Sequence, residues 1–126
     1  MKDYTVKVLD DRDLEFIEAL RSLGVQRNVA ALVTYLSNAK EVSSREIEMG
    51  TGLRQPEVSI GMRFLRQNGW IEERDVKGEG KGRPMKVYTL KVSIDEIIKH
   101  FEDQKLKESA KAMESIRKLR ELTSTA

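Results

Sequence analysis

Hydrophobic residues recur at helical spacing in the first part of the chain. Leu14, Ile17 and Leu20 lie three residues apart and Gly24 follows them, which predicts a helix that ends near residue 23. A second helix is predicted over about residues 28–38. Its apolar stripe consists of Val29, Leu32, Val33 and Leu36.

Two more helices are predicted close together, with a glycine-containing turn between them. Ser43 and Glu46 have the spacing of a capping box, so the third helix begins there. The segment 50–53, Gly-Thr-Gly-Leu, supplies the turn, because glycine adopts positive φ at little cost. The fourth helix begins near Gln55 and ends before Gly69, a left-handed cap. Its core stripe is predicted to be Val58, Met62 and Leu65, with Pro56 in its first turn.

Beyond Gly69 the hydrophobic period changes from helical spacing to two. Residues 70–76 and 85–90 alternate in this way and predict the two strands of a hairpin. The segment 77–84 between them holds three glycines, three basic residues and a proline, which is typical of an exposed hairpin tip.

A long C-terminal helix is predicted over residues 93–122. Ser93 and Glu96 repeat the capping-box spacing. At 1.5 Å per residue this helix is about 45 Å long, more than a domain of about 80 residues can cover. Self-association is the simplest cover for its outer half, and packing on its own domain is the alternative. The residues predicted to form the dimer are Ile97, Phe101, Leu106, Met113, Ile116 and Leu119.

Length and composition set limits on this picture. With 126 residues, 39% of them hydrophobic, the chain fits one domain over residues 1–92 and an appended helix over 93–126. The absence of cysteine excludes disulfides and thiolate metal sites, and the single histidine, His100, excludes a histidine-rich one. We therefore expect no metal and no cofactor. No apolar run is long enough to span a membrane and no signal peptide is evident, so we expect a cytoplasmic protein without a membrane partner.

Charge is concentrated in one part of this nearly neutral protein, whose formal net charge is +2. Residues 53–69 and 77–88 together hold seven basic and two acidic residues. Positive charge gathered in this way indicates a surface for nucleic acid. The cations involved are Arg54, Arg63, Arg66, Lys77, Lys81, Arg83 and Lys86.

The fourth helix and the hairpin tip are the candidate DNA-binding elements. Gln55, Ser59 and Arg63 lie four residues apart, so they share one helix face and can reach base edges together. An arginine at the hairpin tip can enter a narrow minor groove. A solvated helix and a flexible solvated hairpin are the alternatives. A phosphate-binding loop is excluded, because the glycines lie between two strands and no Lys-Ser/Thr follows them. The residues of the fourth helix predicted to contact DNA are Arg54, Gln55, Pro56, Ser59, Ile60, Arg63 and Arg66. Those predicted to contact DNA from the hairpin, which we call the wing, are Lys77, Lys81, Arg83 and Lys86.

Residues 28–92 resemble the winged helix–turn–helix domains of bacterial and archaeal transcription regulators. Ser-Ser-Arg-Glu-Ile-Glu-Met-Gly-Thr-Gly-Leu at 43–53, followed by the apolar frame of the fourth helix and Gly-Trp-Ile at 69–71, is similar to the MarR, ArsR and TrmB-like families. Gly-Arg-Pro at 82–84, with Lys86, Tyr88 and Leu90, is similar to the wing and third strand of TrmB-like and ArsR-like members. The chain resembles short, single-domain archaeal members, because it lacks the sugar-binding domain of full-length TrmB proteins.

The resemblance implies an α+β fold with a three-helix core, a β-hairpin wing and a long dimerisation helix. It implies a homodimer that binds double-stranded DNA, with base readout by Gln55, Pro56, Ser59, Ile60 and Arg63 and wing contacts by Lys81 and Arg83. Pro56 and Ile60 depart from the Ser, Thr or Arg often found there. Ile60 can meet a thymine methyl group, or it can face a protein. Metal control is not implied, because the metal-sensing cysteines and histidines of many ArsR proteins are absent.

Two other functions remain to be weighed. A winged helix can serve as a protein-interaction module of the transcription or chromatin machinery, and here its face would centre on Ile60 and Phe64. An enzyme is not expected, because one histidine far from any candidate serine cannot form a nucleophile–base pair. The sequence identifies no small-molecule effector, operator or direction of regulation.

Overall fold

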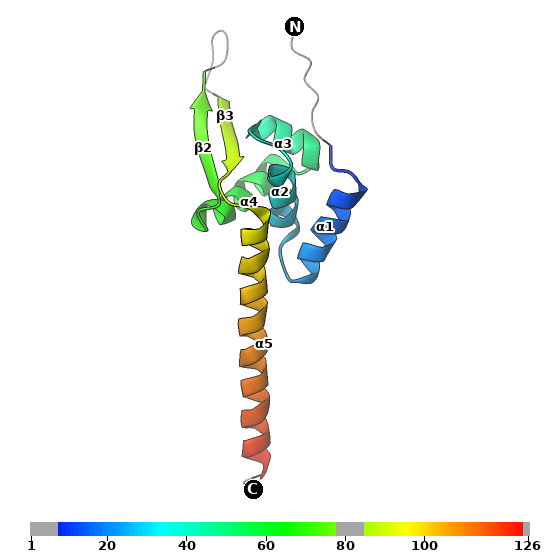
Figure 1. The fold of residues 1–126 in the computed structure, drawn as a ribbon, viewed down its shortest axis with the longest axis vertical. Helices are drawn as coiled ribbons and strands as arrows, with labels where there is room; N and C mark the ends of the chain where they lie inside the picture. Colours follow the sequence, from blue (N-terminus) through cyan, green and yellow to red (C-terminus); the bar gives the residue numbers. More distant parts are fainter. Residues whose placement is uncertain (1–7, 78–84, 125–126) are drawn as a thin grey trace. The chain divides into compact units, whose positions relative to one another are not determined.

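A computed structural model of the chain describes residues 8–77 and 85–124, and it divides into two compact units, residues 1–94 and 95–126 (Figure 1). The elements are α1 (Asp11–Ser22), α2 (Arg27–Ser37), β1 (Val42–Ser43), α3 (Ser44–Thr51), α4 (Gln55–Gln67), β2 (Ile71–Val76), β3 (Met85–Leu90) and α5 (Ile94–Ser124).

Helix α2 is the centre of the first unit. Every residue from Val29 to Leu36 is buried, so this helix has apolar neighbours on nearly all sides. It packs against α1, α3, α4 and β3. Helix α1 begins with a capping box, in which the Asp10 carboxylate accepts from the Asp13 amide at 2.9 Å and the Asp13 carboxylate accepts from the Asp10 amide at 3.0 Å. Ile17 and Leu20 are buried, whereas Leu14 is about half exposed.

The predicted capping box at the start of α3 is present. The Ser43 hydroxyl accepts from the Glu46 amide at 3.2 Å, and a Glu46 carboxylate oxygen accepts from the Ser43 amide at 3.0 Å. Gly52, with a φ of 74°, ends the helix as predicted. Gly50 does not belong to the turn, because it is buried inside α3 and Gly52 alone supplies the positive φ between α3 and α4.

Helix α4 lies across α2 at close range. Gly61 faces Leu32, and a β-carbon added to Gly61 would overlap the Leu32 Cδ1 atom. The Asn28 side-chain amide donates to the Glu57 carbonyl at 3.1 Å and ties the two helices together near the start of α4. Val58, Met62 and Leu65 are buried as predicted, and α4 is followed by Gly69 with a φ of 70°.

The three strands form one antiparallel sheet in the order β1-β3-β2. The predicted hairpin is formed by β2 and β3, with Ile71 opposite Leu90 and Val76 opposite Met85. Strand β1 was not predicted from the sequence. It pairs Val42 with Tyr88, and thereby joins the hairpin to the residue that caps α3.

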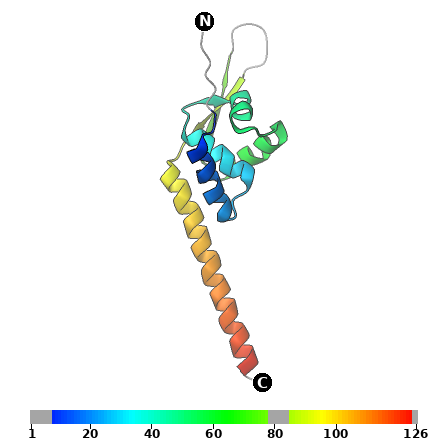
Figure 2. The ribbon, with the colours of Figure 1, turned by 90° about the vertical axis from the view of Figure 1, so that its right-hand side faces the viewer.

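This arrangement is a winged helix–turn–helix of the α+β class, as predicted. Helices α2, α3 and α4 form the three-helix core, α3 and α4 form the helix–turn–helix, and the β2–β3 hairpin is the wing. Figure 2 shows α3 and α4 on the same side of α2, and Figure 1 shows the hairpin beside α4. The fold therefore leaves one face of α4 uncovered beside the wing.

The second unit consists of most of α5, a helix of 31 residues. Ile97 and Phe101 are buried, whereas every residue that the structure describes beyond Phe101 is exposed. Although α5 has the length to cross a bilayer, neither it nor another helix of the described residues has a sufficiently apolar stretch.

Candidate nucleic-acid interface

The exposed face of α4 carries the side chains that the sequence predicted for base contacts. Gln55, Ser59 and Arg63 are all exposed and lie along one side of the helix. The opposite side is fixed by the core through Met62 and Leu65, which are almost completely buried. Because the buried side cannot rotate, the polar side is held outward. This is the geometry that a recognition helix needs to meet a major groove.

The start of α4 is stabilised without a side-chain cap from Arg54. The Glu57 carboxylate accepts from the Arg54 amide at 3.0 Å, which satisfies a donor at the helix start. Glu57 also lies 3.9 Å from the Arg27 guanidinium, a solvated pair of little energetic weight. Arg54 is exposed and, like Arg63, makes no ion pair within residues 8–77 and 85–124. Both guanidinium groups are therefore available to an anionic partner.

Two other predicted cations are already paired. Arg66 Nε lies 3.0 Å from Glu73 Oε1, and Lys86 Nζ lies 3.0 Å from Glu73 Oε2. The hydrogen bond to Glu73 is the main cause that raises the pKa of Lys86, so this ammonium stays charged. The sequence did not predict this cluster, because Glu73 lies on a different element from Arg66 and its carboxylate gave no local signal. The positive charge of Arg66 and Lys86 is thus partly neutralised by the protein itself.

The structure describes part of the wing. Lys77, directly after β2, is exposed, while Lys81 and Arg83 lie outside the described residues. At the base of the wing the Arg74 guanidinium donates to both carboxylate oxygens of Glu41, at 2.8 and 2.7 Å. This bidentate ion pair joins β2 to the segment before β1. It gives the wing a second attachment besides the strand pairing.

Arg45 is a candidate contact that the sequence analysis missed. It is exposed in the first turn of α3, the first helix of the helix–turn–helix. A cation in a helix's first turn gains nothing from the helix dipole, so the dipole gives no structural reason for an arginine here. The first helix of such a motif crosses the DNA backbone. The signal was visible in the sequence as a basic residue directly inside the capping box.

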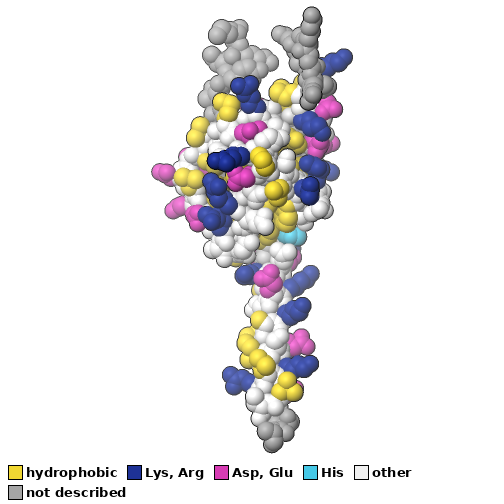
Figure 3. Space-filling view, turned by 180° about the vertical axis from the view of Figure 1, so that it is seen from behind, with side chains coloured by type: hydrophobic (Ala, Val, Ile, Leu, Met, Phe, Trp, Pro, Cys, Tyr) yellow, Lys and Arg dark blue, Asp and Glu magenta, His cyan; other side chains and the backbone are white. Residues whose placement is uncertain are grey.

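The surface around these residues is chemically mixed. Figure 3 views the first unit from the side on which α3 and α4 lie, and Lys and Arg side chains are spread over it among acidic and hydrophobic ones. Ile60, with 57% of its surface exposed, and Met49, with 60%, are the large hydrophobic residues exposed on α4 and α3. Phe64 is only partly exposed and packs edge-to-face on Trp70, with ring centroids 5.8 Å apart.

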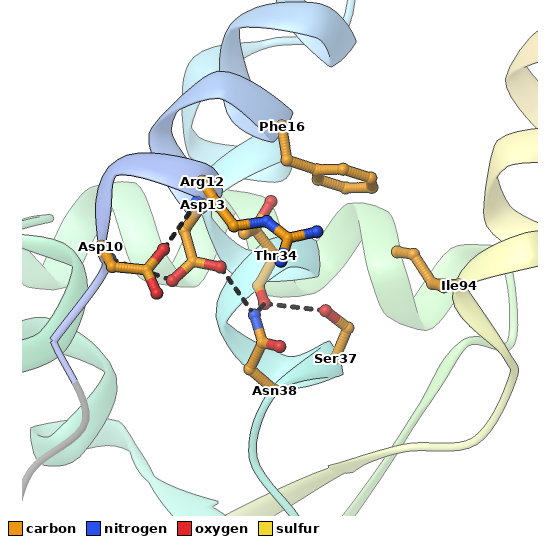
Figure 4. A pocket seen from close by; sticks show the side chains of 8 residues that line it. All are labelled: Asp10, Arg12, Asp13, Phe16, Thr34, Ser37, Asn38 and Ile94. Carbon is orange, nitrogen blue, oxygen red and sulfur yellow. Dashed lines mark hydrogen bonds between the residues drawn. The ribbon is translucent and has the colours of Figure 1, made fainter.

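A hollow of about 400 Å³ lies elsewhere in the first unit, between α1 and the end of α2 (Figure 4). The Asn38 side-chain amide donates to the Asp13 carboxylate at 2.9 Å and to the Thr34 carbonyl at 3.0 Å. Thr34 donates in turn to the Ala30 carbonyl at 2.7 Å. These polar groups hold α1 against α2, so their hydrogen bonds have a structural purpose. The hollow is lined by Asp10, Arg12, Asp13, Phe16, Thr34, Ser37, Asn38 and Ile94.

The residues of α5 predicted for the dimer differ in exposure. Ile97 is completely buried and Phe101 is 6% exposed. Their place in a dimer contact stays a prediction. The other four residues predicted for the dimer are exposed and follow one another at intervals of seven or three residues. These are Leu106, Met113, Ile116 and Leu119.

Two solved structures are similar to the chain at low sequence identity. A MarR family regulator from Neisseria meningitidis is 16% identical with a TM-score of 0.48, and the match covers 89% of this chain and 87% of that one. Pex from Synechococcus is 18% identical with a TM-score of 0.48, and the match covers 79% of this chain and 97% of that one. No protein-family model matches the sequence, and no match was found among curated proteins. The fold assignment rests on the element order and sheet topology of the chain itself.

Proposed function

We propose that this protein is a sequence-specific DNA-binding transcription regulator. The observation that carries the proposal is the outer face of α4, where Gln55, Ser59 and Arg63 project from a helix whose other side is locked into the core. Glutamine pairs with adenine and arginine with guanine through two hydrogen bonds each, so these residue types suit base readout. Arg45, in the first turn of α3, and Arg54, directly before α4, are exposed cations that suit the phosphate backbone.

A protein-interaction module is the second candidate, and the chemistry of α4 supports it less well. A protein-binding face has an apolar centre of several large residues. On α4, Ile60 is the one large hydrophobic residue exposed among those described, because Phe64 is partly covered by Trp70. A single exposed isoleucine among polar and basic neighbours suits a thymine methyl group in a groove.

Selection from a random duplex library tests the proposal. We expect the full chain to enrich a defined site, and Gln55→Ala and Arg63→Ala each to relax the preference at particular positions, by about 1–3 kcal/mol per lost base contact. Gln104→Ala is the matched control, because Gln104 is an exposed glutamine on α5 and not on the reading helix. Enrichment of no site by the unmodified chain would refute sequence-specific binding. An unaltered preference in both variants would refute the assignment of α4 as the reading helix.

We further propose that the regulator is a homodimer joined through α5. Leu106, Met113 and Ile116, with Ser109 between the first two, follow the alternating three- and four-residue spacing of a coiled-coil seam. Two helices that share this seam remove the exposed apolar side chains from water. A two-fold dimer would also present two copies of α4, as palindromic DNA sites require.

Sedimentation equilibrium tests the dimer. Met113→Gln combined with Ile116→Gln should convert dimer to monomer, because it places amides in the seam without changing the charge. The control combines Glu114→Gln with Lys118→Gln, which also leaves the net charge unchanged and lies on the other side of the helix. Equal dissociation of both double variants, or a monomeric unmodified chain, would refute this seam.

A further inference from the structure

Glu73 occupies a position that the proposed DNA-binding function does not require and would not favour. It lies on β2, and its carboxylate contacts a cation from α4 and a cation from β3 at 3.0 Å each. Its side chain is 28% exposed, whereas those of Arg66 and Lys86 are 52% and 57% exposed. The partly buried Glu73 carboxylate thus lies between two more exposed cationic side chains, Arg66 and Lys86, where the reading helix meets the wing.

The two oxygen atoms of the Glu73 carboxylate have different partners. Oε2 accepts a hydrogen bond from the Lys86 ammonium. Oε1 is buried and has no aligned hydrogen-bond donor, so its compensation comes from the charge of the Arg66 guanidinium 3.0 Å away. A buried carboxylate oxygen that loses such a partner is left uncompensated. Glu73 therefore holds Arg66 more firmly than an ordinary surface pair would.

We propose that Glu73 is an internal competitor of the DNA backbone, which holds Arg66 and Lys86 back from phosphate and so limits affinity for DNA of any sequence. The proposal rests on the DNA-binding function proposed above and assigns to it a residue that tunes its strength. Phosphate oxygens and the Glu73 carboxylate offer the same two cations the same kind of charge-assisted contact. DNA must therefore displace the carboxylate before it gains these two contacts. Contacts made by Gln55, Ser59 and Arg63 are unaffected, so the competition lowers affinity for all duplexes alike and leaves the preference between sequences unchanged.

The test compares Glu73→Gln with Glu72→Gln in the full chain. Glu72 is the exposed neighbour on the same strand, so both variants lose one negative charge and differ in the contacts released. Binding to a short random-sequence duplex is measured between about 50 and 200 mM salt. We expect Glu73→Gln to bind about three- to tenfold more tightly than Glu72→Gln, from the usual strength of two such pairs. Its log–log salt slope should be steeper by up to about 1.8, because each added phosphate contact contributes about 0.9.

A second pair of variants covers the case in which Glu73→Gln disturbs the fold. If the carboxylate restrains Arg66, Arg66→Ala alone should change duplex binding little, whereas the same substitution added to Glu73→Gln should remove much of the gained affinity. Circular dichroism melting of each variant identifies a folding defect. A large loss from Arg66→Ala alone would overturn the proposal, since it would mean that Arg66 already contacts phosphate. Equal affinity and salt slope for Glu73→Gln and Glu72→Gln would overturn it as well.

The outcome can be separated from that of the proposed function. The same proteins are eluted from immobilised heparin with salt, because heparin is a polyanion without bases. Later elution of Glu73→Gln than of Glu72→Gln, together with no duplex bound by any variant, would support the competition and refute the DNA target. Site-specific binding by the unmodified chain, with no difference between the two variants, would support the regulator and refute the competition.

Discussion

The close contact between α4 and α2 at Gly61 gives a prediction about what places the reading helix. Replacing Gly61 with alanine has two opposed effects on the free energy of unfolding. Alanine in a helix interior is favoured over glycine by about 1 kcal/mol. The added methyl group, however, would overlap Leu32 Cδ1, and Leu32 is fully buried, so its side chain cannot swing out into solvent.

Overpacking of this kind costs about 1–3 kcal/mol, so it outweighs the gain in helix propensity. We expect Gly61→Ala to lower the free energy of unfolding by about 1 kcal/mol net. Urea unfolding measures it, followed by the fluorescence of Trp70, the one tryptophan, which is buried beside Phe64. All variants are compared at one protein concentration, because association would otherwise change the apparent stability.

The double variant Gly61→Ala with Leu32→Val tests whether steric overlap with Leu32 causes the expected loss of stability. Leu32→Val alone should cost about 1 kcal/mol through the methylene it removes. Combined with Gly61→Ala it should cost less than the sum, by at least about 0.5 kcal/mol, because the shorter side chain makes room for the methyl group. Stabilisation by Gly61→Ala, or strict additivity of the two changes, would refute the view that glycine is needed for the approach of α4 to α2.

Three further predictions concern the cap, the wing and a buried phenol. Ser43→Ala should lower the free energy of unfolding by about 1 kcal/mol through loss of the α3 cap, and an unchanged urea midpoint would contradict this. Lys81→Ala with Arg83→Ala should flatten the log–log salt slope of duplex binding by up to about 1.8, and an unchanged slope would remove these two cations from the interface. Burial raises the pKa of Tyr35 above its usual 10.0, so the folded state retains a proton that the unfolded chain releases, and the stability from this group falls as pH rises through 10 and beyond. Tyr35→Phe should therefore gain stability relative to the unmodified chain in urea unfolding above pH 10, and a constant difference across that pH would show that the phenol does not titrate differently on folding.

The features predicted correctly from the sequence are those that neighbouring residues determine. Ser43 and Glu46 form their box within one helical turn, and Gly52 and Gly69 end helices through their own backbone preference. The stripe of Val58, Met62 and Leu65 indicated which side of α4 faces inward. The exposed side of α4, and hence the candidate base contacts, followed from the same periodicity.

The features that were missed depend on residues far apart in the chain. Strand β1 has two residues, too few to show alternation, and it exists because β3 pairs with it. The ion pairs of Glu73 with Arg66 and Lys86 join three elements, α4, β2 and β3, so no residue spacing along the sequence could predict them.

The strand order β1-β3-β2 leaves β2 with one unpaired edge. Such an edge can recruit a strand from another molecule and begin aggregation. Here four consecutive residues of β2 are charged, Glu72, Glu73, Arg74 and Asp75. An incoming strand would have to bring these charges close to its own backbone and strip them of water, which is costly. The wing can therefore stand out from the core at high protein concentration without becoming a template for misassembly.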